Sequence, residues 1–308
     1  MELVNTSTRM HNGRYEIGLP WKPDLLNLPN NYIVAQQRLL SLGRRFQRDP
    51  DLFRKYSEVI RNNIAKGFAV RVPDEQLSTN YFRRWYLPHH AVVNIKKPQK
   101  IRVLLDCACK FKGISLNDQL YQGPDTTSNL VGVLLRFRNE AIAIASDIEE
   151  MFMQVKVRPN DRGALRFLWW DSDDFTQQPC EYQMTVHPFG ATSSPFCANY
   201  ALQRTVSDFG GNCIPEVSNA IRNNFYVDDC LVSLPNIELA NRFISDITAT
   251  LSHGGFRLRK WISNEPVVLQ GINVDDLAPS VVNIDDNSQI IERTLGLEWN
   301  AVNDNFQF

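Results

Sequence analysis

The stretch FYVDDCLV, residues 225–232, places two neighbouring carboxylates between two short apolar runs. This pattern predicts a β-hairpin with Asp228 and Asp229 as the two residues at its tip. A two-residue hairpin turn usually contains glycine or asparagine, because its backbone needs a positive φ. This turn has neither, and it sets two like charges side by side. The break with ordinary turn chemistry indicates that the carboxylates serve a function.

The composition is typical of a globular protein. The chain has 308 residues, of which 43% are hydrophobic and 22% charged, and its length suggests about two domains. The formal net charge of −1 means that any surface for a polyanion would have to be local. The six cysteines lack zinc spacing, so we expect reduced thiols. We find no signal peptide and no apolar run of about 18 residues, which predicts an intracellular protein without a membrane span.

Helical and strand patterns alternate irregularly along the chain. We expect residues 1–30 to be extended and partly ordered. Helical periodicity predicts helices at 31–47, at 51–66 with Asp49 or Asp51 as cap, from Ser194 as N-cap onward, and at 236–252. Apolar runs predict strands at 68–72, 101–106, 141–146, 166–170, 181–186 and 256–262, and a closing hairpin around 293–299. This order predicts an α+β fold with an antiparallel sheet and helices on one face.

A third carboxylate stands at the exit of a predicted strand. AIAIASDIEEMF, residues 141–152, places Asp147 directly after an apolar run. A sheet could bring it beside Asp228 and Asp229, where three like charges would be costly without a counter-ion. Mg²⁺ removes that cost, and two such ions can promote phosphoryl transfer. The alternative is solvated surface charge, which we expect for the acidic pairs at 171–174, 275–276 and 285–286.

Five segments, taken in order, resemble motifs of reverse transcriptases. YVDD at 226–229 resembles the catalytic hairpin, and the segment at 146–155, SDIEEMFMQV, resembles the motif that carries the first aspartate. The other three are HPFGATSSPF (187–196), HGGFRLRKW (253–261) and TLGLEW (294–299), the last resembling the primer-grip hairpin. Residues 86–125 resemble the fingers. In sequence, these segments most resemble the polymerase segment of BEL/Pao LTR-retrotransposon polyproteins. The resemblance covers residues 85–308 and continues weakly down to about residue 12.

The resemblance implies fingers and a palm, with a ferredoxin-like palm sheet. Residues 1–84 would be a partly helical N-terminal extension leading into the fingers. Residues 85–308 would form fingers and palm, with the palm mainly at 141–157 and 187–308. Thumb, RNase H and integrase domains are not in the sequence, nor is the upstream protease. We therefore expect a fragment of a polyprotein with weak processivity.

The resemblance also implies roles for particular residues. Asp147, Asp228 and Asp229 would be catalytic and would hold two Mg²⁺ ions, or Mn²⁺ in their place, with the backbone carbonyl of Ile148 as a further ligand. Lys260 would lie near the leaving pyrophosphate. The other nucleotide-binding residues would be Arg102, Phe152, Phe189, Gly190 and one of Lys96, Lys97 and Lys100. The primer and template would contact Tyr226, Val227, Leu295 and Gly296.

For several of these residues an ordinary structural role is an alternative to the functional one. Phe152 would exclude a ribose 2′-OH, yet it could be a core aromatic. Gly190 would let the backbone approach the nascent base pair, yet it could be a turn glycine. The guanidinium of Arg102 suits phosphate, and it lies within a stretch, 96–112, with six basic residues and one acidic residue. Tyr226 and Val227 could be plain strand residues, and we read the histidines as structural or template-facing: His89, His90 and His187.

Together, these expectations predict an RNA-directed DNA polymerase that adds dNTPs to a primer 3′-OH. Its partners would be a primed RNA or DNA template and other parts of the polyprotein, with no membrane. Its location would be the cytoplasm, a virus-like particle or the nucleus. Two alternatives stay open: a catalytically weak or inactive remnant that binds nucleic acid or protein, and a two-carboxylate nuclease. The nuclease would not explain Phe152 or the Pro-Phe-Gly segment.

Overall fold

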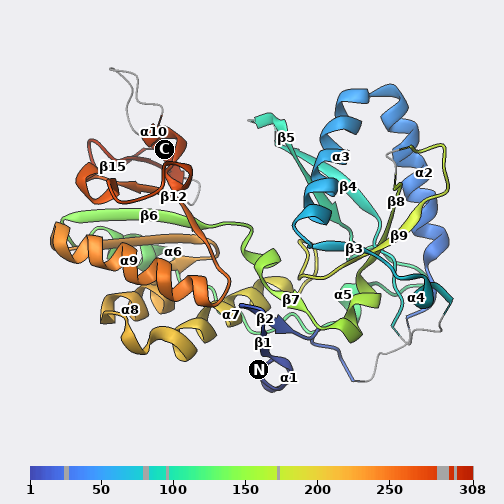
Figure 1. The fold of residues 1–308 in the computed structure, drawn as a ribbon, viewed down its shortest axis with the longest axis horizontal. Helices are drawn as coiled ribbons and strands as arrows, with labels where there is room; N and C mark the ends of the chain where they lie inside the picture. Colours follow the sequence, from blue (N-terminus) through green and yellow to red (C-terminus); the bar gives the residue numbers. More distant parts are fainter. Residues whose placement is uncertain are drawn as a thin grey trace. The chain divides into compact units, whose positions relative to one another are not determined.

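The computed structural model describes residues 1–23, 28–78, 83–94, 97–171, 174–282, 291–294 and 297–307. The chain forms two compact units, each drawn from several stretches of sequence (Figure 1). Unit 1 comprises Met1–His11, Tyr15–Pro124 and Phe152–Cys197, and unit 2 comprises Asn12–Arg14, Asp125–Met151 and Ala198–Phe308. The units do not divide at residue 84, because the residues before and after it pack into the same unit.

Two properties expected from composition can be checked directly. The six cysteines, all in described parts of the chain, are free thiols. Among the described helices, none combines the length and the apolar character that a membrane crossing requires.

Two long helices of unit 1 lie where the periodicity placed them. They are α2 (Tyr32–Arg48) and α3 (Pro50–Ala65). The Asp49 carboxylate accepts a hydrogen bond from the backbone N–H of Leu52 at 3.0 Å, so of the two candidate caps it is Asp49 that begins α3. Gly67, with φ +71°, follows the helix end and directs the chain into the next strand.

Unit 1 contains three small sheets. One has the order β3-β9-β8, a hairpin pairs β4 with β5, and the N-terminal strands form the order β1-β2-β7 with β2 and β7 parallel. The strands are β1 (Arg9–His11), β2 (Arg14–Ile17), β3 (Ala69–Arg71), β4 (His89–Asn94), β5 (Lys97–Leu105), β7 (Lys156–Val157), β8 (Arg166–Trp169) and β9 (Cys180–Met184). Short helices are α1 (Glu2–Ser7), α4 (Asp74–Ser78) and α5 (Leu116–Gln119), with 3₁₀ turns η1 (Met151–Gln154) and η2 (Pro159–Leu165).

The N-terminal residues are more regular than the extended segment we expected. Buried Asp161 in η2 accepts hydrogen bonds from the Leu19 backbone N–H at 2.9 Å and from the Trp21 indole N–H at 2.7 Å. Its third donor is the Arg83 guanidinium, at 2.9 Å. A buried charge is tolerated when it is paired and hydrogen-bonded in this way. Asp161 therefore fastens residues 19–21 to the body of unit 1.

Aromatic side chains and one histidine fill the core of unit 1. Tyr56 of α3 stacks on Trp169 of β8, with ring centroids 5.4 Å apart, and its hydroxyl lies 2.6 Å from His89 Nδ1. His89 Nε2 lies 2.9 Å from the carbonyl oxygen of Leu168, which can only accept. The proton is therefore on Nε2, and Nδ1 accepts from Tyr56. His89 is a structural histidine, and burial lowers its pKa to about 4.

His187 is also structural. It is fully buried, and its Nε2 lies 3.2 Å from the carbonyl oxygen of Ile17 in β2, so Nε2 again carries the proton. Burial lowers the pKa of His187 to about 4. Neither His89 nor His187 faces solvent, which removes the template-facing reading for both.

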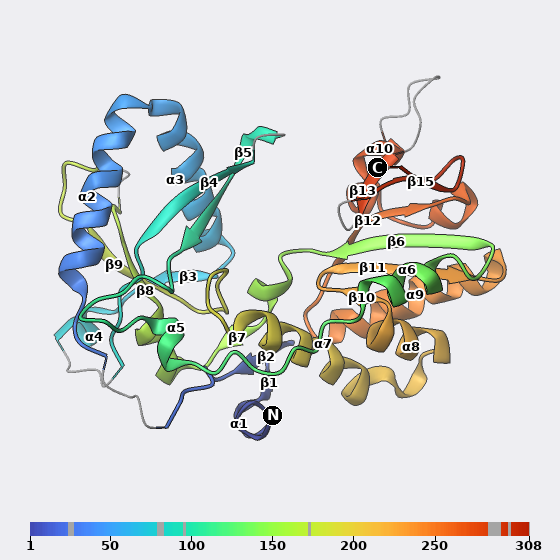
Figure 2. The same cartoon turned by 180° about the vertical axis from the view of Figure 1, so that it is seen from behind.

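Unit 2 is built around a four-stranded antiparallel sheet with the order β10-β11-β6-β12 (Figure 2). Its strands are β6 (Ile142–Ile148), β10 (Phe225–Tyr226), β11 (Asp229–Leu234) and β12 (Leu258–Ser263). Helices between β6 and β10 and between β11 and β12 complete the split βαββαβ pattern of ferredoxin-like folds. The α+β class with an antiparallel sheet is confirmed.

Helices and a small C-terminal sheet cover the faces of this sheet. Figure 1 shows α8 and α9 along one side and the C-terminal strands on the other. On the latter side, Phe137 of α6 packs against Trp299 with ring centroids 4.9 Å apart, over Ala143, Ala145 and Leu231 of the sheet. The helices are α6 (Leu130–Phe137), α7 (Ser194–Phe209), α8 (Pro215–Asn223), α9 (Ile237–His253) and α10 (Pro279–Val282), with 3₁₀ turns η3 (Gly210–Asn212), η4 (Pro266–Leu269) and η5 (Val274–Asp276). The C-terminal strands are β13 (Ile291–Thr294), β14 (Leu297–Asn300) and β15 (Asn305–Gln307).

The two buried histidines predict acid sensitivity of the fold. An unfolded histidine binds its proton near pH 6.5, whereas His89 and His187 do so near pH 4 in the folded chain. Between these values the unfolded state holds more protons, so stability is complete above about pH 6.5 and falls as the pH drops toward 4. The loss is roughly 3 kcal/mol per histidine at the end of that window.

Urea unfolding followed by tryptophan fluorescence between pH 7.5 and 5 checks this expectation. His187→Gln keeps an N–H donor for Ile17 but takes up no proton, so its stability should fall less steeply with pH than that of the wild type. His90→Gln, which replaces an exposed imidazole, is the control. Equal slopes for the wild type and His187→Gln would contradict the assignment.

Candidate active site

The end of β6 carries Asp147 to the edge of the apolar sheet. Residues 143–146 are buried, and the Asp147 side chain is 15% exposed. Ile148, which follows it, is buried. The strand therefore holds a carboxylate at the border between core and solvent, as the sequence predicted for the exit of this apolar run.

The ladder between β6 and β11 brings the distant acidic residues together. Asp229 is the Cα partner of Asp147, and directly opposite residues in an antiparallel pair lie about 4.5–5.5 Å apart on one face. The Ile148 backbone N–H donates to the carbonyl oxygen of Asp228 at 2.8 Å. The backbones of Asp147, Asp228 and Asp229 thus converge, although Asp147 is far from the others in sequence.

The hairpin tip differs by one residue from our expectation. Tyr226 pairs with Asp229, so the two tip residues are Val227 and Asp228, and Asp229 is the first residue of β11. Asp229 belongs to the strand because its pairing with Asp147 extends the ladder by one position. Val227 takes the positive φ, +58°, that a tight turn needs. A β-branched residue is rare there and costs about 1–3 kcal/mol, a form of strain found at functional sites.

Lys260 contacts the first carboxylate. Its Nζ forms an ion pair with Asp147 Oδ2. Lys260 lies where the β12–β6 register shifts, between Arg259 and Ile262, and its φ is +54°. The sequence resemblance placed Lys260 near a leaving pyrophosphate. It gave no indication of the contact with Asp147, because the bulge that directs the side chain cannot be recognised from the residues FRLRKW.

A charged network anchors the strand beside Asp147. Arg259, the Cα partner of Asp147 on β12, binds Glu149 Oε1 at 2.6 Å and donates to the Asp275 carbonyl oxygen at 2.8 Å. The hydrogen bond that Arg259 donates to the Glu149 carboxylate is the main cause of a raised pKa for Arg259. Asp276 binds Arg257 at 2.7 Å. Asp276 is therefore part of this network, and our reading of it as solvated charge was wrong, since no local pattern reveals partners on another element. Asp275 is exposed, and it takes part in the network through its backbone carbonyl oxygen.

Asp147 keeps one oxygen suited to a metal ion. Among the described residues, its Oδ1 is buried and has no hydrogen-bond partner, while Oδ2 contacts Lys260. An unpaired buried carboxylate oxygen is costly, and a hard cation removes that cost. No three His, Cys, Asp or Glu side chains in the described ranges form a ready cation cluster. Mg²⁺ commonly takes only one or two carboxylates together with waters and substrate phosphates, so the residues present fit such an ion.

Two aromatic candidates of unit 1 lie together. The rings of Phe152 and Phe189 are 4.8 Å apart between centroids and inclined by 46°, and Phe189 is 42% exposed. Phe152 is partly buried against it, so it is not an ordinary core aromatic. The pair presents an aromatic surface from two segments that are distant in the sequence.

The loop before α7 is held by its neighbours. The Asn117 amide donates to the carbonyl oxygen of Gly190 at 3.1 Å, and its oxygen accepts from the Thr192 N–H at 2.9 Å. The Ser194 hydroxyl donates to the Pro188 carbonyl oxygen at 2.7 Å, so Ser194 closes this loop and its side chain does not cap α7 as we expected. Gly190, with φ +106°, passes so close to the Leu105 carbonyl oxygen that a Cβ would lie 2.3 Å from it.

The structure describes only some of the remaining nucleotide-binding and primer-binding candidates. Lys100 and Arg102 are exposed on β5, where Arg102 pairs with Val92 of β4. Lys97 begins β5, but its side chain lies outside the described part of the structure. Lys96, Leu295 and Gly296 lie outside the described residues altogether.

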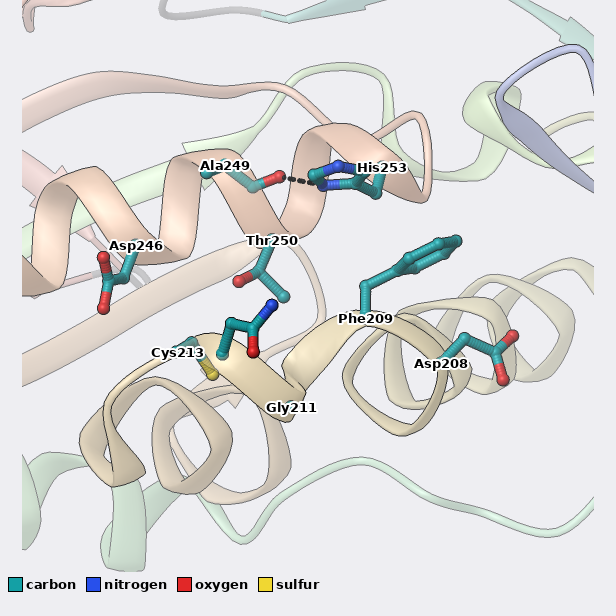
Figure 3. Close-up of a pocket in the computed structure, with 9 residues that line it drawn as sticks. Asp208, Phe209, Gly211, Cys213, Asp246, Ala249, Thr250 and His253 are labelled. Atoms are coloured by element: carbon teal, nitrogen blue, oxygen red, sulfur yellow. Dashed lines mark hydrogen bonds between the residues drawn. The ribbon is translucent and has the colours of Figure 1, made fainter.

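A pocket elsewhere in unit 2 lacks this chemistry. It has a volume of about 380 Å³ and lies between the end of α7 and α9 (Figure 3). Phe209 stacks on His253, whose Nδ1 lies 2.7 Å from the Ala249 carbonyl oxygen. Asp208 and Asp246 lie at opposite ends of the view, the first bound to Arg204 and the second accepting from the Ile214 N–H. Its polar groups therefore serve the fold.

Comparison with known proteins adds little. No protein-family model matches the sequence, and no curated protein matches it. Among solved structures, the chain is similar to a foamy viral protease-reverse transcriptase in complex with double-stranded DNA (TM-score 0.49, 14% identity). It is also similar to a prototype foamy virus protease-reverse transcriptase mutant (TM-score 0.47, 15% identity). Each alignment covers 66% of this chain and only 30% and 23% of the respective relatives. Since both TM-scores lie below 0.5, these similarities carry no functional conclusion.

The approach of Gly190 to Leu105 predicts a specific stability defect. Gly190→Ala would place a Cβ against a backbone oxygen, whereas Gly113→Ala, at φ +81°, meets no atom within 4 Å. Both substitutions cost about 1 kcal/mol for the positive φ. Gly190→Ala should lose roughly 1–3 kcal/mol more from overpacking. Chemical denaturation of both variants measures the difference, and equal losses would contradict the contact.

Proposed function

We propose that this chain is the polymerase domain of an RNA-directed DNA polymerase of the BEL/Pao LTR-retrotransposon type. It would add dNTPs to a primer 3′-OH on an RNA or DNA template. The observation that carries the proposal is the β6–β11 register, which sets Asp147 opposite Asp229 and binds Ile148 to the Asp228 carbonyl. Strain at Val227, on the tip of the same hairpin, supports a functional reading of this edge.

On this proposal Asp147, Asp228 and Asp229 would hold Mg²⁺, with Ile148 contributing its carbonyl oxygen. When bound, Mg²⁺ supplies neutralisation of the charge that develops on phosphate oxygens, and Mn²⁺ could replace it. The buried, unpartnered Oδ1 of Asp147 is a donor suited to such an ion. The sheet holds these groups in place before substrate arrives, which is the protein's main contribution to phosphoryl transfer.

The roles of the other residues follow from their chemistry. Exposed Arg102 and Lys100 on β5 suit phosphate groups, because a guanidinium binds phosphate in a fork and an ammonium binds it as a point charge. The Phe152–Phe189 pair suits the sugar and base of an incoming nucleotide. Template binding would rest mainly on phosphate contacts and so weaken with salt. The remaining parts of the polyprotein would be natural partners.

One observation favours a second candidate, a catalytically weak or inactive remnant that binds nucleic acid or protein. Lys260 already neutralises one oxygen of Asp147 from within the chain. A domain that no longer used a metal ion could be stabilised by this ion pair.

Primer extension separates the two candidates. With an RNA template, a DNA primer, dNTPs and Mg²⁺ at low salt, the wild type should extend the primer. Asp228→Asn should reduce extension to background because it removes a ligand charge. Asp208→Asn is the matched control in the same unit, since Asp208 lies on α7, where it forms an ion pair with Arg204. Absence of extension by ample wild-type protein favours the remnant, and undiminished extension by Asp228→Asn rejects the carboxylate site.

The aromatic pair predicts how sugars are selected. If the Phe152 ring excludes a 2′-OH, Phe152→Ala should lower the preference for dNTPs over rNTPs on the order of tenfold or more, because room opens beside the sugar. Single-nucleotide incorporation with matched dNTP and rNTP measures the ratio. Phe209→Ala, which removes the ring that stacks on His253, is the control. An unchanged ratio in Phe152→Ala rejects the gate.

A further inference from the structure

The bulge in β12 decides which side of the sheet Lys260 faces. Arg259 pairs with Asp147, and a regular ladder would then pair Trp261 with Ala145, leaving Lys260 on the face opposite to Asp147. Instead Ile262 pairs with Ala145, so one extra residue lies between the two pairs. Lys260, which has a φ of +54°, is the extra residue of this bulge, and its side chain reaches Asp147.

The bulge is held on both sides. Before it, Arg259 binds Glu149 and the Asp275 carbonyl oxygen. After it, the Trp261 carbonyl oxygen accepts from the Ala278 N–H at 3.0 Å, and Trp261 is buried. The backbone of Lys260 is thus fixed at both neighbours, and its contact with Asp147 is built into the fold.

The side chains of the ion pair differ in exposure. Lys260 is 58% exposed, whereas Asp147 is 15% exposed. A half-exposed ion pair is weak and can open without unfolding its surroundings. The ammonium and a divalent cation would compete for the same carboxylate, because Oδ2 is taken by Lys260 and only Oδ1 is unpartnered.

We propose that Lys260 acts as a built-in counter-ion that holds the place of a metal ion on Asp147 and must be displaced before a divalent cation binds. This inference rests on the proposed function, since it assumes that Asp147 is a metal ligand. Lys260 stabilises the acidic edge in the free protein and lowers its affinity for metal. The cation site then fills fully only when further ligands, such as substrate phosphates, add to the carboxylates.

Mn²⁺ binding to the full chain, without nucleotide or nucleic acid, tests the proposal by a readout other than activity. The signal of free Mn²⁺ in electron paramagnetic resonance gives the dissociation constant at fixed pH. Lys260→Met should bind Mn²⁺ roughly two- to fivefold more tightly, the range expected for removing a partly exposed ion pair. Lys260→Gln should do the same, and Lys260→Arg should stay near the wild type.

Two controls separate the outcomes. Arg242→Met makes the same charge change in unit 2, on α9, where Arg242 lies 3.8 Å from Asp246, and should leave Mn²⁺ affinity unchanged. In an Asp147→Asn background, Lys260→Met should have no effect. If Mn²⁺ binding depends on Asp147 but Lys260→Met and Lys260→Gln bind as the wild type does, the counter-ion role is overturned while the metal site stands. If no variant binds Mn²⁺ through Asp147, the counter-ion role and the metal site of the proposed function both fail.

Discussion

The antiparallel ladder between β6 and β11 fixes where every acidic group of the site lies. Six consecutive Cα pairs join Asp229–Leu234 to Asp147–Ile142 in reverse order. Because side chains alternate between faces, a slip of one residue would exchange the buried faces of both strands and separate Asp147 from Asp229. Apolar residues on both faces of β6 resist that slip, since Ala143 and Ala145 pack toward Trp299 and Ile144 is buried as well. Core packing therefore sets the position of the carboxylates.

Placing carboxylates side by side carries an electrostatic cost, and neighbouring positive charge offsets part of it. Lys260 and Arg259, both on β12, bring positive charge to Asp147, one through a contact and one through the ladder. The backbone also takes strained conformations nearby. Of six non-glycine residues with positive φ in the described chain, three are close in sequence or in pairing to Asp147: Glu150, Val227 and Lys260. Strain of this kind persists only where the surrounding structure imposes it.

Polar side chains, of which Asp161 and His89 are buried, organise unit 1 as much as its aromatic core does. Asp161 binds the N-terminal residues, Asn117 binds the loop at Gly190, and His89 joins α3 to the β8 backbone through Tyr56. Each of these groups finds partners from distant segments, which is how a buried polar side chain avoids a desolvation penalty. The exposed Phe152–Phe189 pair lies next to this rigid framework, because the loop that carries Phe189 is fastened by Asn117 and Ser194.

The sequence alone determined the type and approximate limits of most elements, the antiparallel α+β class, and the two places where carboxylates leave apolar strands. These features depend on local periodicity and on residues close in the chain. Short helices such as α6 and α8 gave no sufficient local signal. The tertiary structure alone decided the β6–β11 register, the shift of the hairpin tip to Val227 and Asp228, and the contact of Lys260 with Asp147. It also gave Asp276 and Asp161 their partners, because bulges, registers and buried ion pairs arise from contacts between segments that no local pattern relates.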